Sequence, residues 1–525
     1  MGTAVMSENG EFHHAAGASL RGMNTTPATA LPDPRICELA RRSRDARFDG
    51  LFFTAVSSTG IYCRPVCPAP AARRSNVRYY ANAAAAEADG FRPCLRCRPE
   101  LAPGNEFWQH GDDVVASALK LIADGALAEQ SLEQLATRVG IGGRQLRRLF
   151  VQRVGVPPHS VYTTQRLLFA KQLLTETALP VTEVALASGF RSLRRFNAAF
   201  AQANRIEPRQ LRRTPRATRD APLVLRLAYR PPYAFDALLE FLHTRALPGV
   251  ERVDTHSYAR VFGPAEAPGW LQLERWPDRS HSLRLQVHCP DAAELLGVVT
   301  RLRRMFDLDA NPALINEAFA RDPLLGPLCV RHPGLRVPGS WDGFETAVRA
   351  VLGQQVSVAA ARTLAARIVQ RYGTPLATPP HPGLERLFPT PAVLASADLR
   401  DIGVTTSRAA TIRGIAQALQ DGRVTFDQAQ SLDEFVQRWT ALPGIGPWTA
   451  HYIAMRVQSE PDAFPAADLI LRRAAAGGGT PLSERALLAR AAAWQPWRAY
   501  AVMQLWRASG EPTKNQSTTR ARRSQ

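Results

Sequence analysis

The chain lacks any apolar run near the roughly 18 residues that a membrane-spanning helix needs, and its first thirty residues lack the apolar core of a secretory signal. Lysine is also nearly missing, because only three of the 65 basic residues are lysines: Lys120, Lys171 and Lys514. Chemistry between residues 172 and 513 therefore cannot use a lysine amine. These absences predict a cytoplasmic protein whose positive charge is almost entirely arginine.

Acidic residues are too few to balance that charge. The chain has 46 Asp and Glu residues against 65 Lys and Arg, which gives a formal net charge of +19 and an isoelectric point near 10.4. This is too basic for an ordinary soluble enzyme and indicates a polyanionic partner. We therefore expect association with the nucleoid. With 525 residues the chain is long enough for about three or four domains.

Cysteine is scarce too, but four of the seven cysteines form two close pairs: Cys63 with Cys67, and Cys94 with Cys97. The other three show no pairing pattern, as expected in a reducing compartment. Two close pairs separated by 26 residues are typical of a tetrahedral four-thiolate zinc site rather than of a disulfide set. We predict one bound Zn²⁺, and the spacing alone leaves open an inert zinc ribbon as the alternative to a reactive site.

The residues that flank the cysteines are more specific than their spacing. The segments Gly60–Cys67, Tyr79–Asn82 and Gly90–Cys97 closely resemble the amino-terminal domain of the Ada adaptive-response protein. The resemblance implies that Cys63, the first ligand, is also a nucleophile that takes a methyl group from a DNA methylphosphotriester. Zinc keeps such a thiol deprotonated at neutral pH, and a thiolate is the form that can displace the methyl group.

Residues 112–213 are helical by period and contain an internal repeat. Each half reads as a helix, a glycine turn at Gly140 or Gly189, and a second helix, and the helical stretch Pro158–Thr177 joins the two halves. This is the helix-turn-helix pattern. The pair resembles the AraC-type DNA-binding domain, which also follows the zinc domain in the Ada protein.

Arginine is concentrated on both predicted recognition helices, with no acidic residue nearby. Its guanidinium can fork onto a phosphate or a guanine edge, although an arginine-rich helix face taken alone is usually only solvated. Two such faces, each after a helix-turn signature, favour contact with DNA. The residues expected there are Arg144, Arg147, Arg148, Arg191, Arg194 and Arg195.

From residue 222 to 331 the pattern changes to short alternating apolar runs, interrupted by two helical stretches at 234–245 and 291–306. This indicates a small α+β domain with an antiparallel sheet. The segment resembles the amino-terminal domain of AlkA-type alkylpurine glycosylases. The resemblance implies that Phe241 borders a base pocket, although a phenylalanine in such a helix is more often a core residue.

Residues 332–510 are again helical and contain a helix-hairpin-helix motif. Its turn is Gly444-Ile445-Gly446, in which the glycines allow a tight bend and bare the backbone amides for a DNA phosphate at the start of the next helix. The motif also occurs in ligases, polymerases and nucleases. Asp468, placed 22 residues after Gly446, narrows the resemblance to the helix-hairpin-helix glycosylase superfamily.

The superfamily resemblance implies that Asp468 faces the sugar of a flipped nucleotide, where a carboxylate stabilises the oxocarbenium-like transition state and can orient the attacking water. Alternatively, Asp468 only caps the helix that follows it. The AlkA-type resemblance implies a base pocket of Trp448, Tyr452 and Trp506, whose rings can stack on a base made cationic by alkylation. Gln355 matches a position where the Escherichia-type member has a leucine that enters the gap left by the flipped base. The resemblance therefore implies a polar wedge at Gln355.

We therefore expect a multidomain chain with two disordered ends. Residues 99–110 and 212–222 read as linkers, and 321–338 reads as a boundary between packed domains. The expected parts are a disordered leader (1–30), a small four-cysteine zinc α+β domain (31–107), an all-α double helix-turn-helix domain (112–213), an α+β antiparallel-sheet domain (222–331), an all-α helix-hairpin-helix glycosylase domain (332–510) and a disordered basic tail (511–525).

The predicted function is DNA alkylation repair and response. A monofunctional DNA-3-methyladenine glycosylase would carry a methyl-accepting, DNA-binding front half, as a monomer acting on alkylated and promoter duplexes, with RNA polymerase as a candidate partner and no membrane. One alternative is a transcription regulator whose glycosylase half is vestigial or only grips DNA. Another is a front half that only tethers the enzyme to DNA. The chain has no Pro-Cys-His-Arg motif, so direct reversal of O6-methylguanine is not expected.

Overall fold

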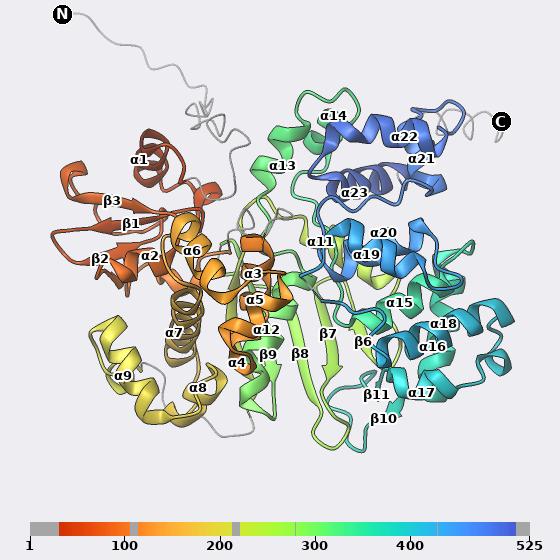
Figure 1. Ribbon diagram of the computed structural model, residues 1–525, viewed down its shortest axis with the longest axis horizontal. Coiled ribbons are helices and arrows are strands. Elements are labelled where there is room, and N and C mark those ends of the chain that lie inside the picture. Colours follow the sequence, from red (N-terminus) through yellow and green to blue (C-terminus); the bar gives the residue numbers. More distant parts are fainter. Residues whose placement is uncertain (1–30, 105–113, 213–220, 279, 428, 511–525) are drawn as a thin grey trace, which may run out of the picture.

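The computed structural model describes residues 31–104, 114–212, 221–278, 280–427 and 429–510. The predicted disordered ends lie outside these residues, as do most of the first two predicted linkers. Figure 1 shows the chain running from red at the left, through a central green sheet, to blue at the right. We call the four parts the cysteine domain (31–104), the helix-turn-helix domain (114–212), the sheet domain (221–331) and the hairpin domain (332–510).

The cysteine domain combines a four-stranded sheet with two helices. The strand order is β3-β1-β2-β4, with β2 and β4 parallel and the other neighbours antiparallel. Asn82 starts the second helix because its side chain accepts the Ala85 amide at 2.8 Å, a common N-cap. The elements are α1 (Pro34–Ser43), β1 (Phe53–Val56), β2 (Ile61–Cys63), β3 (Val77–Tyr80), α2 (Ala83–Ala88) and β4 (Arg92–Pro93).

The helix-turn-helix domain contains two similar units joined by the long helix α7 (Pro158–Glu176). Each unit turns at a glycine with positive φ, Gly140 at 77° and Gly189 at 74°, a conformation that other residues rarely adopt. Phe150 and Phe196 anchor the second helix of each unit, and both are fully buried. The other helices are α3 (Val114–Ala123), α4 (Ala126–Glu129), α5 (Leu132–Arg138), α6 (Gly143–Val154), α8 (Val181–Ala187), α9 (Leu193–Asn204) and α10 (Pro208–Leu211).

The sheet domain confirms the predicted antiparallel sheet, with strand order β5-β9-β8-β7-β6. The sequence pattern does not predict β6, because two of its three residues are charged. Residues 321–338, predicted as a boundary, contain helix α14. The elements are β5 (Leu223–Ala228), α11 (Phe235–His243), β6 (Glu251–Val253), β7 (Ser257–Phe262), β8 (Gly269–Arg275), β9 (Ser282–His288), α12 (Leu295–Met305), α13 (Pro312–Phe319) and α14 (Leu325–Arg331).

The hairpin domain is helical around one large apolar core, apart from the short pair β10 and β11, which the sequence does not predict. None of the described helices in the chain is long and apolar enough to cross a membrane. The elements are α15 (Gly343–Leu352), α16 (Val358–Tyr372), β10 (Thr374–Pro375), β11 (Arg386–Leu387), α17 (Pro391–Ser396), α18 (Thr406–Gln420), α19 (Leu432–Thr440), α20 (Pro447–Val457), α21 (Leu469–Ala475), α22 (Glu484–Ala491) and α23 (Arg498–Ser509).

Helix α7 joins the cysteine domain to the helix-turn-helix domain through a buried ion pair. Lys171 is only 1% exposed, and its Nζ donates to Glu100 Oε2 at 2.6 Å and to the Cys94 carbonyl at 3.1 Å. The segment that contains Glu100 is a short 3₁₀ helix, Pro99–Leu101. The first predicted linker therefore begins as a packed segment. Its Glu100 carboxylate is buried, and a buried charge needs a partner of opposite sign beside it.

A second buried cation joins the cysteine domain to the sheet domain. Arg230 is fully buried and donates to the carbonyls of Asp49 at 2.7 Å and Pro103 at 3.2 Å. Beside it, the Gly104 amide donates to Asp309 Oδ1 at 2.6 Å. A planar guanidinium can satisfy several carbonyls at once, which a lysine ammonium does less well.

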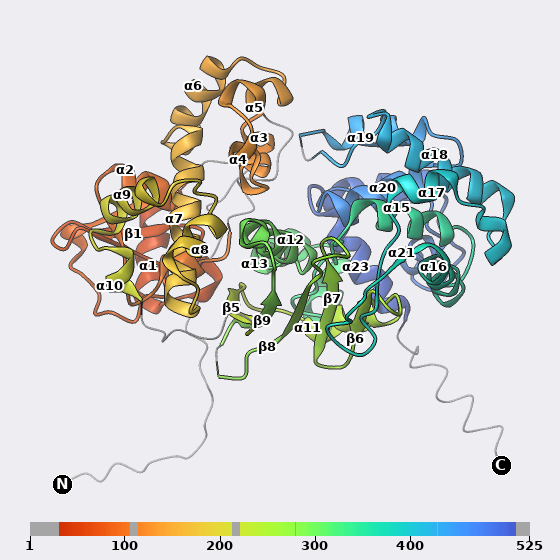
Figure 2. The same cartoon turned by 90° about the horizontal axis from the view of Figure 1, so that it is seen from below.

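The first helix-turn-helix unit also contacts the hairpin domain, through more exposed charges. Arg138 at the end of α5 pairs with Asp427 at 3.0 Å, and Lys120 Nζ lies 3.7 Å from Glu460 Oε2. Figure 2 shows this unit at the top, beside α19. Surface pairs of this kind contribute little individually, whereas the apolar core of the unit includes Tyr162 of α7 and Ala84 of α2.

We predict that Lys171→Met destabilises the front half of the protein by about 3 kcal/mol, because it leaves the buried Glu100 carboxylate short of a partner. The double variant Lys171→Met/Glu100→Gln should recover most of that loss. Both stability changes can be measured by urea unfolding that is monitored through hydrogen exchange in residues 31–212. Lys120→Met is the matched control and should change the stability by less than about 1 kcal/mol. Equal losses in the two lysine variants would contradict the prediction.

Candidate active site and metal centre

Four cysteine sulfurs gather at one edge of the cysteine domain. The sulfurs of Cys63, Cys67, Cys94 and Cys97 all lie within 4.8 Å of one another. Tetrahedral zinc with bonds of about 2.3 Å requires sulfur separations of about 3.8 Å, so the cluster fits one Zn²⁺. The predicted zinc site is therefore confirmed. Within it, Cys94 and Cys97 are buried, whereas Cys63 and Cys67 are half-buried on the more open side.

Backbone and arginine contacts hold these cysteines in place. The Arg64 amide donates to Cys97 Sγ and the Arg96 amide to Cys94 Sγ, both at 3.3 Å. The buried Arg64 guanidinium donates from Nε to Asp49 Oδ1 at 2.8 Å and from Nη1 to the Cys97 carbonyl at 3.2 Å. Such outer contacts orient metal ligands and stabilise the thiolate form.

The six arginines predicted to contact DNA lie on the two recognition elements. Arg144, Arg147 and Arg148 belong to α6, Arg194 and Arg195 to α9, and Arg191 to the turn before α9. All six are exposed. None of them pairs with an acidic residue in the described part of the chain, so their charge is available to an anionic ligand.

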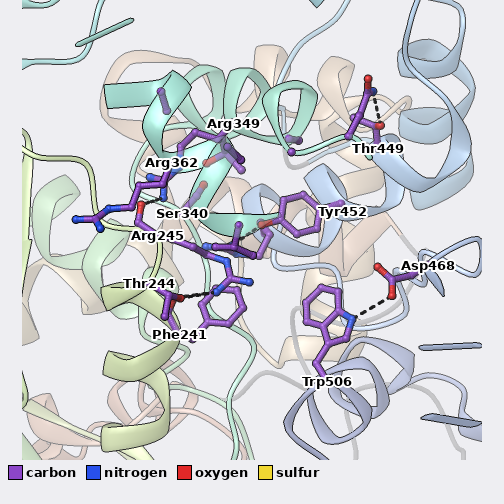
Figure 3. Close-up of a pocket in the computed structure, with 18 of the residues that line it drawn as sticks. Phe241, Thr244, Arg245, Ser340, Arg349, Arg362, Thr449, Tyr452, Asp468 and Trp506 are labelled. Atoms are coloured by element: carbon purple, nitrogen blue, oxygen red, sulfur yellow. Dashed lines mark hydrogen bonds between the residues drawn. The ribbon is translucent and has the colours of Figure 1, made fainter. Parts of the chain in front are cut away.

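A cavity of about 1600 Å³ opens between α11, the α15–α16 loop, α20, α21 and α23 (Figure 3). It brings together all the residues predicted for the base pocket and its wedge, together with Asp468. These residues are Phe241, Gln355, Trp448, Tyr452, Asp468 and Trp506. Phe241 comes from the sheet domain and is half-buried, so it is a wall of the cavity rather than a residue of the central core. The cavity is therefore built by two domains.

Asp468 both caps a helix and faces the cavity. Its Oδ1 accepts the Leu471 amide at 3.0 Å, which starts α21, and its Oδ2 accepts Trp448 Nε1 at 3.1 Å. Trp506 Nε1 points at the same carboxylate from 3.5 Å (Figure 3). The preceding loop is held by α20, because His451 Nδ1 accepts the Phe464 amide at 3.3 Å. The carboxylate is thereby fixed in orientation while remaining partly exposed.

Aromatic rings form the walls beside the carboxylate. Trp448 and Tyr452 stack with centroids 5.4 Å apart and planes 10° apart, since they lie one turn apart on α20. Phe241 and Trp506 form a second near-parallel pair, with centroids 6.5 Å apart. Parallel rings of this kind offer flat faces to a planar ligand such as a nucleobase.

Two arginines that line the cavity were not predicted. The Arg245 guanidinium lies 3.7 Å from the centroid of the Phe241 ring, and Arg456 Nη1 donates to Tyr452 Oη at 2.7 Å. Burial raises the pKa of Tyr452, but the charges of Arg456, Arg245 and Arg349 outweigh burial and leave that pKa below its ordinary value. A signal was available: Arg245 and Arg456 each follow a pocket aromatic by four residues, although only Arg456 shares a helix with its aromatic, since Arg245 lies just past the end of α11.

The hairpin turn is formed as its glycines predict. Gly444 has φ of 84°, and a Cβ there would lie 2.0 Å from Thr411 Oγ1, so only glycine fits. Gly446 caps α20 without any side chain, and nothing lies within 4 Å of its Cβ position. Ile445 is 5% exposed and anchors the turn in the core. The exposed Gly446 amide is thus open to an anion at the start of α20, whose first residue, Pro447, has no N–H.

Family models match the chain in four consecutive segments. The metal binding domain of Ada matches residues 37–100, and a helix-turn-helix domain matches 135–214. The AlkA N-terminal domain matches 224–342, and the HhH-GPD superfamily of base excision DNA repair proteins matches 348–498.

Some relatives are similar in sequence to one half of this chain, and another is similar to nearly the whole chain. DNA-3-methyladenine glycosylase 2 of Escherichia coli is 36% identical over 291 residues, 54% of this chain and 97% of the relative. The bifunctional transcriptional activator/DNA repair enzyme Ada of Escherichia coli is 38% identical over 148 residues, 28% of this chain and 40% of the relative.

A third relative spans nearly the entire chain. A Mycobacterium tuberculosis protein named "Probable bifunctional transcriptional activator/DNA repair enzyme AlkA" is 42% identical over 476 residues, 90% of this chain and 95% of the relative. The chain belongs to the same family, in which an Ada-type zinc module and a helix-turn-helix module precede an AlkA-type glycosylase.

Proposed function

We propose that the protein is a DNA-3-methyladenine glycosylase whose front half accepts methyl groups and binds DNA. The main support for glycosylase activity is the position of the Asp468 carboxylate at the mouth of an aromatic cavity. The start of α21 and the Trp448 indole N–H fix its orientation. An intact carboxylate and pocket argue against a vestigial enzyme that only grips DNA.

In this proposal the damaged nucleotide leaves the helix and its base enters between the aromatic rings. Cleavage of the C1′–N bond leaves the bonding electrons on the base and positive charge on the sugar, which Asp468 stabilises from close range. Water then adds to C1′ and loses a proton to Asp468 or solvent. A base made cationic by alkylation leaves as a neutral molecule, so no residue has to protonate it.

The hairpin supplies the grip on DNA that keeps the nucleotide in place. Gly446 is exposed just before α20 and presents its backbone amide, and the helix dipole favours a negative ligand at that end. Trp448 lies on the first turn of α20, so a phosphate held there sets the distance between the DNA backbone and the cavity.

For the front half, we infer that Cys63 is the methyl acceptor. It matches the acceptor position of the Ada-type motif and is half-buried, as is Cys67, whereas Cys94 and Cys97 are buried. Zinc, when bound, supplies a thiolate at neutral pH. In the transfer a sulfur–carbon bond forms, the methyl carbon–oxygen bond breaks, and the DNA leaves as an ordinary phosphodiester anion.

The exposed arginines of α6 and α9 would hold this half on promoter DNA. Loss of one negative charge at the cysteine cluster should strengthen that hold by reducing repulsion from phosphate. RNA polymerase is the proposed partner of the regulatory half. We also propose that the protein acts as a cytoplasmic monomer with the nucleoid, since one chain supplies every residue of both sites.

We predict that Asp468→Asn lowers base release from methylated duplex DNA by about 100- to 1000-fold. Asparagine is itself a good N-cap, so α21 keeps its start while the charge is lost. Single-turnover release of 3-methyladenine measures the effect. Asp401→Asn, which removes an exposed carboxylate elsewhere in the same domain, is the control and should leave the rate unchanged. A fall of less than tenfold for Asp468→Asn would rule out the assigned role.

We predict that incubation with methylated DNA adds 14 daltons, about the mass of one methyl replacing a proton, to the peptide that carries Cys63. Mass mapping of the full chain locates the label. Cys63→Ser should abolish it while the other three sulfurs still bind metal more weakly. A label confined to Cys67, Cys94 or Cys97 would reassign the nucleophile, and no label would favour an inert zinc ribbon.

We predict that the glycosylase leaves an intact abasic site. Strand cleavage through a Schiff base requires an amine. The residue two positions after the second hairpin glycine is Trp448, which has no amine, and the whole stretch 172–513 contains no lysine. Borohydride added during turnover should trap no covalent complex on the hairpin domain, and gels without alkali should show uncut strands. Nicking that disappears in Asp468→Asn would contradict this.

A further inference from the structure

The loop between α15 and α16 forms one rim of the cavity and is tied to the hairpin. The Gln354 side chain donates from Nε2 to the Gly444 carbonyl at 3.0 Å and to Thr449 Oγ1 at 3.0 Å. Arg408 in turn donates to the Gln354 carbonyl. The loop therefore has a fixed position relative to the turn that is proposed to hold a DNA phosphate.

Gln355, the next residue, is held in an unusual way. Its φ is 54°, in the left-handed region that residues other than glycine occupy only when their surroundings impose it. Its side chain is exposed and makes no hydrogen bond to any described residue. The neighbouring Val356 is also 37% exposed. An unengaged amide thus projects from a rigid loop at the mouth of the cavity.

A base that turns into the cavity leaves a gap in the stack and an orphaned partner base. The Watson–Crick edge of that partner loses its hydrogen bonds, and polar groups without partners are costly where water is excluded. A side chain at the mouth of the cavity is in the right place to enter the gap. An apolar side chain would fill the gap but leave that edge unsatisfied.

We propose that Gln355 enters the gap and hydrogen-bonds the Watson–Crick edge of the orphaned base, whichever base it is. This inference rests on the proposed glycosylase function. A carboxamide has an acceptor oxygen beside a donor nitrogen. Adenine and cytosine present an amino donor next to a ring-nitrogen acceptor, and guanine and thymine present a carbonyl acceptor next to an imino donor. A half-turn of the amide matches either arrangement, so the enzyme would act with little regard to the opposite base.

The test uses binding to duplexes in which no base pair has to be opened. A tetrahydrofuran abasic analogue is placed opposite A, C, G or T, or opposite a second tetrahydrofuran. For each variant of the full-length protein, the affinity for the four duplexes is divided by that for the duplex with no opposite base. Wild type should favour an orphaned base nearly equally for all four. In Gln355→Leu this preference should fall by about 3- to 10-fold.

A second variant distinguishes hydrogen bonding from filling of space. Gln355→Glu keeps a similar shape but offers only acceptors, and guanine alone has two adjacent donors, N1–H and N2–H, on this edge. The other three bases offer one donor each, so the preference should rank guanine first by about tenfold, the value of one additional hydrogen bond to a charged group. The added charge weakens binding to every duplex alike and leaves the ranking unaffected. A wedge that acts by shape alone predicts no such ranking.

The possible outcomes separate this inference from the function it rests on. If Gln355→Leu and wild type give the same ratios, or if Gln355→Glu shows no preference for guanine, the inference is wrong. If wild type releases no base from methylated DNA and does not prefer abasic to undamaged duplex, the glycosylase proposal itself fails. Gln355 is exposed, so both variants should keep the wild-type thermal midpoint, which circular dichroism checks.

Discussion

Charges buried in pairs across the domain boundaries are the constraint on which the rest of this structure depends. Lys171 and Glu100 join the helix-turn-helix domain to the cysteine domain, and both side chains are 1% exposed or less. Arg260 and Glu345 do the same between the sheet and hairpin domains, each 4% exposed. A buried pair of this kind adds little stability compared with an apolar contact, but separating it is costly. It therefore specifies one arrangement of neighbouring domains.

The cavity depends on the second of these boundaries. Phe241 reaches Trp506 only because α11 of the sheet domain packs on the hairpin domain. Arg349 of α15 strengthens that boundary by pairing with Glu251 at 3.0 Å and donating to the Arg245 carbonyl at 2.6 Å. Although burial raises the pKa of Tyr452, the charge of Arg349, together with those of Arg456 and Arg245, leaves that pKa below its ordinary value. The contacts that fix the domains thus also set the electrostatic character of the pocket.

Local features of this protein were predictable from the sequence because their physical causes are local. The two close cysteine pairs, the glycines at 140 and 189, and the Gly444-Ile445-Gly446 turn each involve a few neighbouring residues, and the structure forms all of them. The bonds of Arg230, in contrast, depend on residues up to 181 positions away. Arg245 and Arg456 have a helical spacing signal, but arginine is so abundant here that composition hides it. The roles of Asp468 and Cys63 were inferred from resemblance, because their sequence patterns alone indicate only a helix cap and a metal ligand.

The near absence of lysine connects these observations. A guanidinium can satisfy several backbone carbonyls in a buried boundary, as Arg230 does, whereas an ammonium is better suited to a compact pair such as that of Lys171. Arginine also stays protonated in any surroundings and so cannot act as a nucleophilic amine. A chain that builds its boundaries and its DNA-facing surfaces from arginine leaves the cavity without an amine. Under the proposed function, Asp468 is then the cavity carboxylate that acts on the sugar, and water is the nucleophile that it directs.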